Sequence, residues 1–148
     1  MITITLYTKI YPSEDQEIIE QILNQFGIAE NSVISEISNT PVKSIEKTFH
    51  GLESTHFIFN QVRRNRTVEA FRQFLLARLK PEADSITFMI NKQVLTNGKI
   101  VLCKTPSESP LGPVWVTLKS ANLLLLINYL FPPTQKGIVL ESDIIPQD

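Results

Sequence analysis

The sequence has little of what many chemistries require, with one cysteine and two histidines in 148 residues. A single cysteine excludes an internal disulfide and fits a reducing cytoplasm. These side chains cannot supply a structural zinc site by themselves. Because Cys103 lies in the apolar run KIVLCK, we expect a buried structural thiol rather than a nucleophile. We therefore expect no metal and no small-molecule cofactor.

Long apolar runs are also missing. The longest run, residues 123–127, has five members, whereas a membrane span needs ~20. The N-terminus alternates and lacks a basic region followed by an apolar block, so it does not resemble a secretory signal. A chain with 43% hydrophobic and 20% charged residues is typical of a soluble globular protein. We expect one cytoplasmic domain, residues 1–148, with a short acidic tail from about residue 141.

The motifs of common enzyme classes are absent as well. The sequence has no Gly-rich phosphate loop, no Walker pattern and no nucleophile elbow. His50 and His56, together with Lys92, have the chemistry for acid–base work on a phosphodiester. Their spacing matches no specific motif, and a histidine near a turn is usually structural. We therefore expect a protein that is not an enzyme, with a metal-independent phosphodiesterase as a minor alternative.

What the sequence does have is a concentration of positive charge in residues 62–80. This segment holds all five arginines and Lys80 against a single acid, so its net charge is +5 in a chain of net charge −1. Its apolar residues follow the spacing of one helical face, which predicts one helix that packs on the core and carries the charge. These residues are Val68, Phe71, Phe74, Leu75 and Leu79.

Three of the arginines lie where we expect this helix to begin. A helix N-terminus favours negative charge, so guanidinium groups beside free N-terminal amides suit a bound phosphate better than they suit helix stability. The expected phosphate contacts are Arg63, Arg64, Arg66 and Lys92. The accessory residues are His50, Gln93 and Arg72. The alternative is a solvated or salt-bridged loop beside the acidic remainder of the chain.

Alternation of apolar and polar residues predicts most of the strands. They are expected at residues 2–11, 33–37, 43–50, 55–62, 85–91, 100–103 and 114–119. Residues 43–50 and 55–62 are close enough to pair as a hairpin. Helices are expected between Ser13 and Gly27, over residues 62–80, and from Ser120 to about Phe131. Since strands and helices do not alternate strictly, the expected fold class is α+β, a mainly antiparallel sheet with helices packed on one face.

Two features of these elements bear on binding. Tyr7 and Trp115 fall on the outward faces of their strands, where their rings can stack on unpaired bases. A surface or interface role is the alternative for Trp115. The last predicted helix is apolar nearly all round, so it must be buried in the core or in a dimer contact.

Five short segments carry a family resemblance. They are ITITLYTKIY, Phe49-His50-Gly51, TVEAFRQFLLARL, ITFMINKQ and VWVTLK. In this order they resemble an archaeal family of conserved proteins described as predicted RNA-binding or predicted exosome-associated proteins. The resemblance covers residues 2–130, with the best matches at His50-Gly51 and Lys92-Gln93. The family pattern has Gly-Asn-Pro after the histidine and an aspartate before Lys-Gln, whereas this sequence has Gly51-Leu52-Glu53 and Asn91.

The resemblance implies a fold like that of the ribosomal protein that holds the small rRNA of the large subunit. It also implies an archaeal cytoplasmic setting and a role in RNA processing or at the ribosome. We therefore expect a non-catalytic RNA-binding protein whose partners are RNA and an RNA-processing protein or a second copy. The alternative is a protein–protein interaction module or homodimer that binds no nucleic acid.

Overall fold

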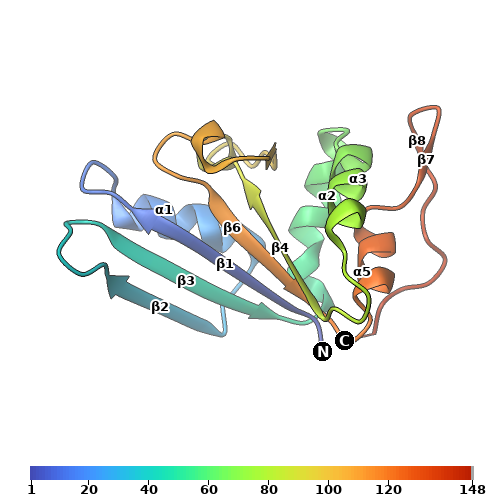
Figure 1. The fold of residues 1–148 in the computed structure, drawn as a ribbon, viewed down its shortest axis with the longest axis horizontal. Helices are drawn as coiled ribbons and strands as arrows, with labels where there is room; N and C mark the ends of the chain where they lie inside the picture. Colours follow the sequence, from blue (N-terminus) through green and yellow to red (C-terminus); the bar gives the residue numbers. More distant parts are fainter. Residues whose placement is uncertain (148) are drawn as a thin grey trace.

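The structure is a computed structural model and describes residues 1–147. Its centre is a six-stranded sheet in the order β2-β3-β1-β6-β4-β5, in which all neighbours are antiparallel (Figure 1). The strands are β1 (Thr3–Ile10), β2 (Asn31–Glu36), β3 (Lys43–His50), β4 (Ser85–Ile90), β5 (Leu102–Cys103) and β6 (Val114–Lys119). A separate hairpin pairs β7 (Thr134–Gln135) with β8 (Ile138–Val139).

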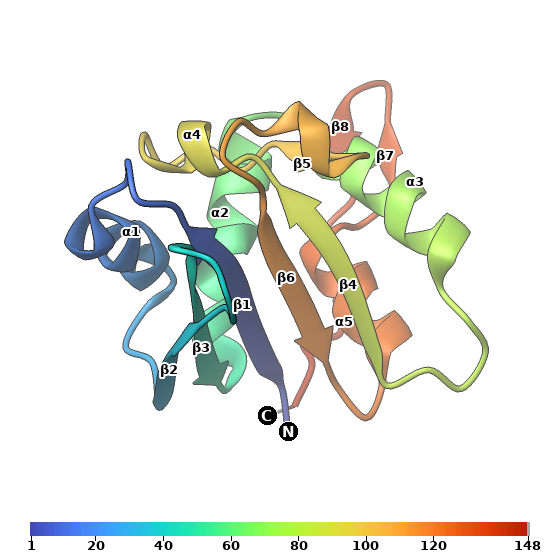
Figure 2. The same ribbon diagram turned by 60° about the vertical axis from the view of Figure 1, so that its left-hand side comes forward.

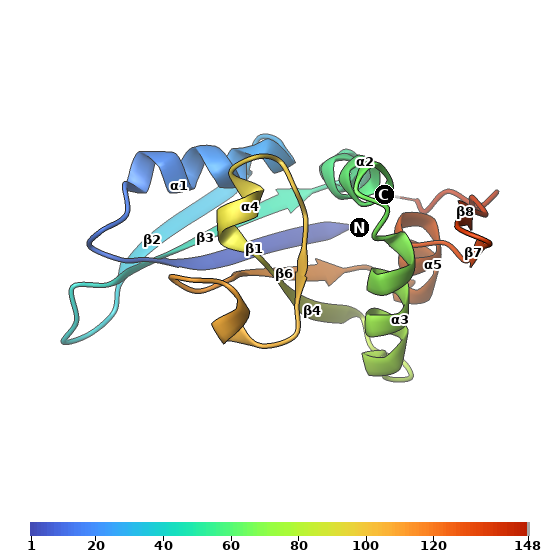
Figure 3. The same cartoon turned by 90° about the horizontal axis from the view of Figure 1, so that it is seen from above.

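The helices gather on one side of this sheet. The α-helices of the described residues are α1 (Gln16–Leu23), α2 (His56–Arg64), α3 (Val68–Arg78), α4 (Lys92–Leu95) and α5 (Leu123–Leu130). Short 3₁₀ turns occupy Asn24–Phe26, Leu52–Thr55 and Pro106–Glu108. In Figure 2 the central strands β1, β6 and β4 lie in front of α2 and α5. Seen from above in Figure 3, α1 and α2 follow one another along the same side of β3. The fold class is α+β, as expected.

The alternation of the strands explains this layering. In β1 the side chains of Ile4 and Leu6 are fully buried, whereas Thr5 and Tyr7 are half-buried. β6 and β4 follow the same alternation, so one face of the sheet forms the core with the helices and the other is open. Each buried aliphatic side chain contributes about 1.5–3 kcal/mol, which fixes the register of these strands.

The prediction of a strand at residues 55–62 is wrong, because this segment forms most of α2. The turn at Gly51 (φ 93°) leads into a 3₁₀ turn and then a helix, and no hairpin with β3 forms. Ile58 and Val62, one helical turn apart, are buried in the core. The aromatic rings that suggested a strand pack instead on other helical segments: Phe57 on Phe26 and Phe59 on Tyr129.

The single helix expected over residues 62–80 is also wrong, because α2 ends at Arg64 and α3 begins at Val68. Between them the backbone N–H of Thr67 donates to Val62 O (2.9 Å), and the N–H of Arg66 donates to Arg63 O (3.2 Å). These are the two bonds of a Schellman motif, with Arg66 in the left-handed conformation (φ 56°) that glycine usually takes. Because Arg66 and not glycine takes this position, the sequence lacks the usual signal of a helix C-terminus.

Smaller differences concern element ends. Asp15 caps α1 instead of Ser13, and Asn122 caps α5 instead of Ser120. The strand expected at residues 100–103 is reduced to β5. Within residues 1–147, no helix is both long enough and apolar enough to cross a membrane.

Candidate nucleic-acid interface

The open face of the sheet carries a row of large side chains at its centre. Strand register places Tyr7 of β1 directly opposite Trp115 of β6, and Trp115 directly opposite Met89 of β4. Directly opposite residues lie on the same face with Cβ atoms about 4.5–5.5 Å apart. All three side chains are half-buried, so part of each remains accessible on this face. We call Tyr7, Trp115 and Met89 the aromatic row, after the two rings that it contains.

Hydroxyl groups line the next row of the same face. Thr48, Thr5, Thr117 and Thr87 are successive cross-strand neighbours from β3 to β4. The hydroxyls of Thr87 and Thr117 are hydrogen-bonded to each other at 2.8 Å. Each hydroxyl can both donate and accept a hydrogen bond, so this row presents polar groups that suit the base edges or sugar hydroxyls of a nucleic acid lying across the sheet.

Two lysines flank the aromatic row on this face. Lys9 is the penultimate residue of β1 on one side, Lys119 is the last residue of β6 on the other, and both are exposed. Glu46, opposite Tyr7, is the nearest acid in the register. His50 completes the Lys119 end, where its Nδ1 lies 3.3 Å from Thr3 Oγ1 and its Nε2 lies 3.4 Å from a carboxylate oxygen of Glu30. His50 is thus on the open face, but its ring nitrogens have protein partners.

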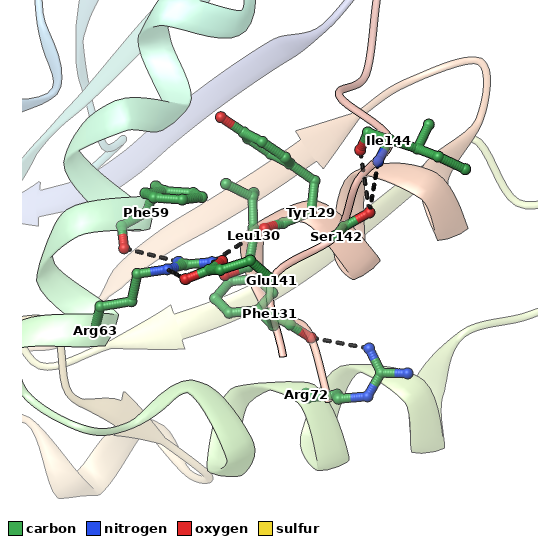
Figure 4. A network of polar contacts seen from close by, with 9 residues as sticks. All are labelled: Phe59, Arg63, Arg72, Tyr129, Leu130, Phe131, Glu141, Ser142 and Ile144. Atoms are coloured by element: carbon green, nitrogen blue, oxygen red, sulfur yellow. Dashed lines mark hydrogen bonds and ion pairs between the residues drawn. The ribbon is translucent and has the colours of Figure 1, made fainter. Parts of the chain in front are cut away.

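Arg63 is occupied by protein groups (Figure 4). Its Nη1 donates to Phe59 O (2.9 Å) and Leu130 O (3.0 Å), and its Nη2 donates to Tyr129 O (3.2 Å). Its Nε and Nη2 also bind both carboxylate oxygens of Glu141 at 3.0 and 2.7 Å. The guanidinium stacks over the ring of Phe59, 3.4 Å from its centroid. Arg63 therefore ties α2 to the end of α5 and to the acidic C-terminal segment.

Arg72, on α3, also donates hydrogen bonds to the C-terminal end of α5. Its Nη1 donates to Asn128 Oδ1 (2.8 Å) and to Phe131 O (2.9 Å). The last carbonyls of a helix lack partners within it and carry partial negative charge. α5 has no basic residue in its last turn, and Arg63 and Arg72 supply both the donors and the positive charge from neighbouring helices.

The expectation that Arg63 and Arg64 lie at the start of a helix is wrong, because the helix breaks between α2 and α3. Both lie in the last turn of α2, where positive charge is favourable by about 0.3–1 kcal/mol, and not at a helix N-terminus. Arg64 and Arg66 are exposed. Arg66 and Arg63 line a hollow of about 540 Å³ between the α2–α3 junction and the β7–β8 hairpin, together with Lys136.

Lys92 lies elsewhere and is buried, with 2% of its surface exposed. Its Nζ donates to Glu14 Oε1 (3.0 Å) and to Lys9 O (2.9 Å). Burial lowers the pKa of Lys92 from its ordinary 10.5, and the hydrogen bond and charge of Glu14 oppose that shift. The neighbouring Gln93 is exposed and accepts from Ser109 Oγ at 3.4 Å. The predicted residues are thus distributed over separate places and do not form one site.

The class of protein defined by this fold and face is an α+β protein with one helix-covered and one open sheet face. No family model matches the chain. A UPF0201 protein of Sulfurisphaera tokodaii is 33% identical over 148 residues, covering 100% of this chain and 99% of that protein. One of Sulfolobus acidocaldarius is 31% identical over 140 residues, covering 94% and 93%. The chain belongs to the archaeal UPF0201 family.

Solved structures share the fold. The crystal structure of a UPF0201 protein from Methanococcus jannaschii has a TM-score of 0.77 at 17% identity and covers 94% of this chain and 99% of that chain. A DUF54 protein of Methanothermobacter thermautotrophicus has a TM-score of 0.60 at 13% identity, with 79% and 82% covered. The resemblance seen in the motifs is confirmed as far as a conserved archaeal family, and RNA binding and exosome association stay predictions.

Proposed function

We propose that this protein is a non-catalytic RNA-binding protein that holds single-stranded RNA on the open face of its sheet. The observation that carries the proposal is the aromatic row, in which Tyr7 and Trp115 are cross-strand neighbours on central strands of the open face. Base–aromatic stacking is worth about 1–3 kcal/mol per base and tolerates any sequence. Both rings are half-buried, and the part of each ring that stays accessible offers a flat apolar surface to a base.

The charges support the same ligand class. Lys9 and Lys119 bracket the aromatic row and are placed to meet the phosphates of a strand whose bases stack on it. Phosphate contacts act over a Debye length of about 8 Å at physiological salt, so local cations suffice in a chain of net charge −1. Arg64 and Arg66 remain proposed phosphate contacts because they are exposed. Arg63 and Lys92 are dropped from that role because their donors bind protein groups.

The wider setting is part of the proposal. A role in RNA processing or at the ribosome, association with an exosome, a cytoplasmic location and a fold like the ribosomal protein named above are all implied by the family resemblance alone. The alternative function is a protein-interaction module, in which the aromatic row would contact a protein. The two functions make different predictions for nucleic acid.

The experiment is fluorescence anisotropy with labelled single-stranded and hairpin RNAs over a salt series. We expect salt-sensitive binding that prefers single strands and falls at least tenfold in the double variant Tyr7→Ala, Trp115→Ala. The matched control is Tyr7→Phe, Trp115→Phe, which keeps both rings and should bind within about threefold of wild type. Arg64→Glu with Arg66→Glu should weaken all RNAs alike and flatten the salt dependence. Absence of RNA binding at low salt would favour the protein-interaction function.

A further inference from the structure

The edge strand β2 is the least protected part of the sheet. All six of its residues, Asn31–Glu36, are exposed, and it pairs only with β3 among residues 1–147. The bond from Ile37 N to Val42 O (3.1 Å) fixes the alternation, so Ser32, Ile34 and Glu36 direct their backbone N–H and C=O groups outward. Proteins often protect such edges with charged residues, above all lysine, or with proline; β2 contains no lysine and no proline, and its one charged residue is Glu36 at its end.

Exposed aliphatic side chains surround the same edge. Val33 is 48% exposed on one face of β2, and Ile34 is 42% exposed on the other. Ile28, just before the strand, is 95% exposed. Exposed aliphatic side chains on both faces of an unpaired strand edge are typical of a surface that pairs with another chain.

Next to β2 lies a buried lysine side chain that has no negatively charged partner in the part of the chain that the structure describes. Lys47 is 6% exposed, and its Nζ donates to Asn24 Oδ1 at 2.8 Å. Among residues 1–147, no carboxylate oxygen lies within 4.0 Å of it. Ser32 of β2 is directly opposite Lys47, and both line a hollow of about 510 Å³ that opens beside the edge. Burial of a charge is costly unless a counter-charge is supplied.

We propose that two copies of this chain pair through β2 as an antiparallel, isologous dimer with Ile34 opposite the second copy's Ile34. In this register the outward-facing groups of Ser32 meet those of the second copy's Glu36, so each outward residue completes its hydrogen bonds. The short Ser32 side chain leaves room for the second copy's Glu36 carboxylate to extend toward Lys47. Each copy thus supplies the anion that the other lacks, and the two Ile34 side chains cover one another.

The symmetry has a structural consequence. A two-fold axis perpendicular to the sheet keeps both open faces on the same side and joins them into one continuous sheet. The dimer does not depend on RNA binding, and its failure would leave the proposed function standing.

The test is sedimentation velocity from about 1 to about 500 µM protein, concentrations at which a modest interface assembles. Ile34→Lys places two ammonium groups opposite each other and should weaken dimerisation at least tenfold. Leu124→Lys, which changes a residue 49% exposed on α5, is the matched control and should leave it unchanged. Glu36→Gln should weaken dimerisation about fivefold and should make dimerisation less sensitive to salt.

Amide hydrogen exchange gives a second readout that does not require a variant. On going from about 5 to about 500 µM, the amides of Ser32, Ile34 and Glu36 should gain protection, while those of Val33 and Ser35, which face β3, should not change. A monomer across the whole range would overturn the proposal. A dimer that forms equally well with Ile34→Lys, or that protects other amides instead, would overturn it as well.

Discussion

Arg63 gives the sharpest prediction about stability, because its sequence context suggested a ligand contact and its geometry shows a structural role. The side chain is 16% exposed and donates to three backbone carbonyls from α2 and α5. A hydrogen bond from a charged donor contributes about 1.5–3 kcal/mol when buried, and these three are partly buried, so we assign about 1 kcal/mol to each. The exposed pair with Glu141 adds less than about 1 kcal/mol.

Arg63→Ala should therefore lower the free energy of unfolding by about 3–4 kcal/mol, and the lost packing of the guanidinium on Phe59 adds to this. Arg64→Ala, one residue away and exposed, is the matched control and should change it by less than about 0.5 kcal/mol. Urea denaturation followed by circular dichroism measures both. If Arg63→Ala costs no more than Arg64→Ala, the assignment of Arg63 as a tie between α2, α5 and the C-terminal segment is refuted.

Other predictions concern buried charge, backbone strain and the thiol. Glu14→Ala leaves the buried Lys92 ammonium without its carboxylate and should cost about 3 kcal/mol in a denaturation experiment. Because the pKa of Lys92 is lowered in the folded state, the unfolded chain binds more protons just below pH 10.5. The contribution of Lys92 to stability should therefore rise with pH in that alkaline range. Comparing the pH dependence of unfolding for wild type and Lys92→Met isolates this contribution. Arg66→Gly relieves the left-handed conformation and should raise the free energy of unfolding by about 0.5–1 kcal/mol; a loss of stability would contradict the Schellman geometry. Burial, with a smaller effect of Glu108, raises the pKa of Cys103, so a thiol reagent should modify it only on unfolding, and rapid labelling of the native protein would contradict this.

The strands were predictable where one face of the strand is buried and the other is open, because apolar and polar residues then alternate along the sequence. In β1, β4 and β6 the apolar side chains occupy every second position, and tertiary packing agrees with local preference. The prediction of a strand at residues 55–62 is wrong because Phe57 and Phe59 favour a strand locally, while the burial of both Ile58 and Val62 requires a helix. That requirement comes from segments distant in sequence, so no local pattern contains it.

The candidate site was predictable only in part. The alternation placed Tyr7 and Trp115 on the outward face, but their direct opposition depends on the register between β1 and β6, which sequence alone did not supply. Arg63 shows the converse. Its carbonyl partners Tyr129 and Leu130 lie 66 and 67 residues away, so a charge pattern could not reveal that its donors are taken. Lys92 was similarly identified by its charge, although its counter-ion Glu14 lies 78 residues away.

The central claim is that RNA stacks on the open sheet face, and the chain carries its own reporter in its single tryptophan, Trp115. The most direct measurement is the fluorescence of Trp115 during titration with a short single-stranded RNA at low salt. The account predicts saturable quenching that is reversed by added salt and strongly reduced in a folded Tyr7→Ala variant. RNA binding detected by anisotropy without any change in Trp115 fluorescence would contradict the account, and so would a titration in which no RNA binds.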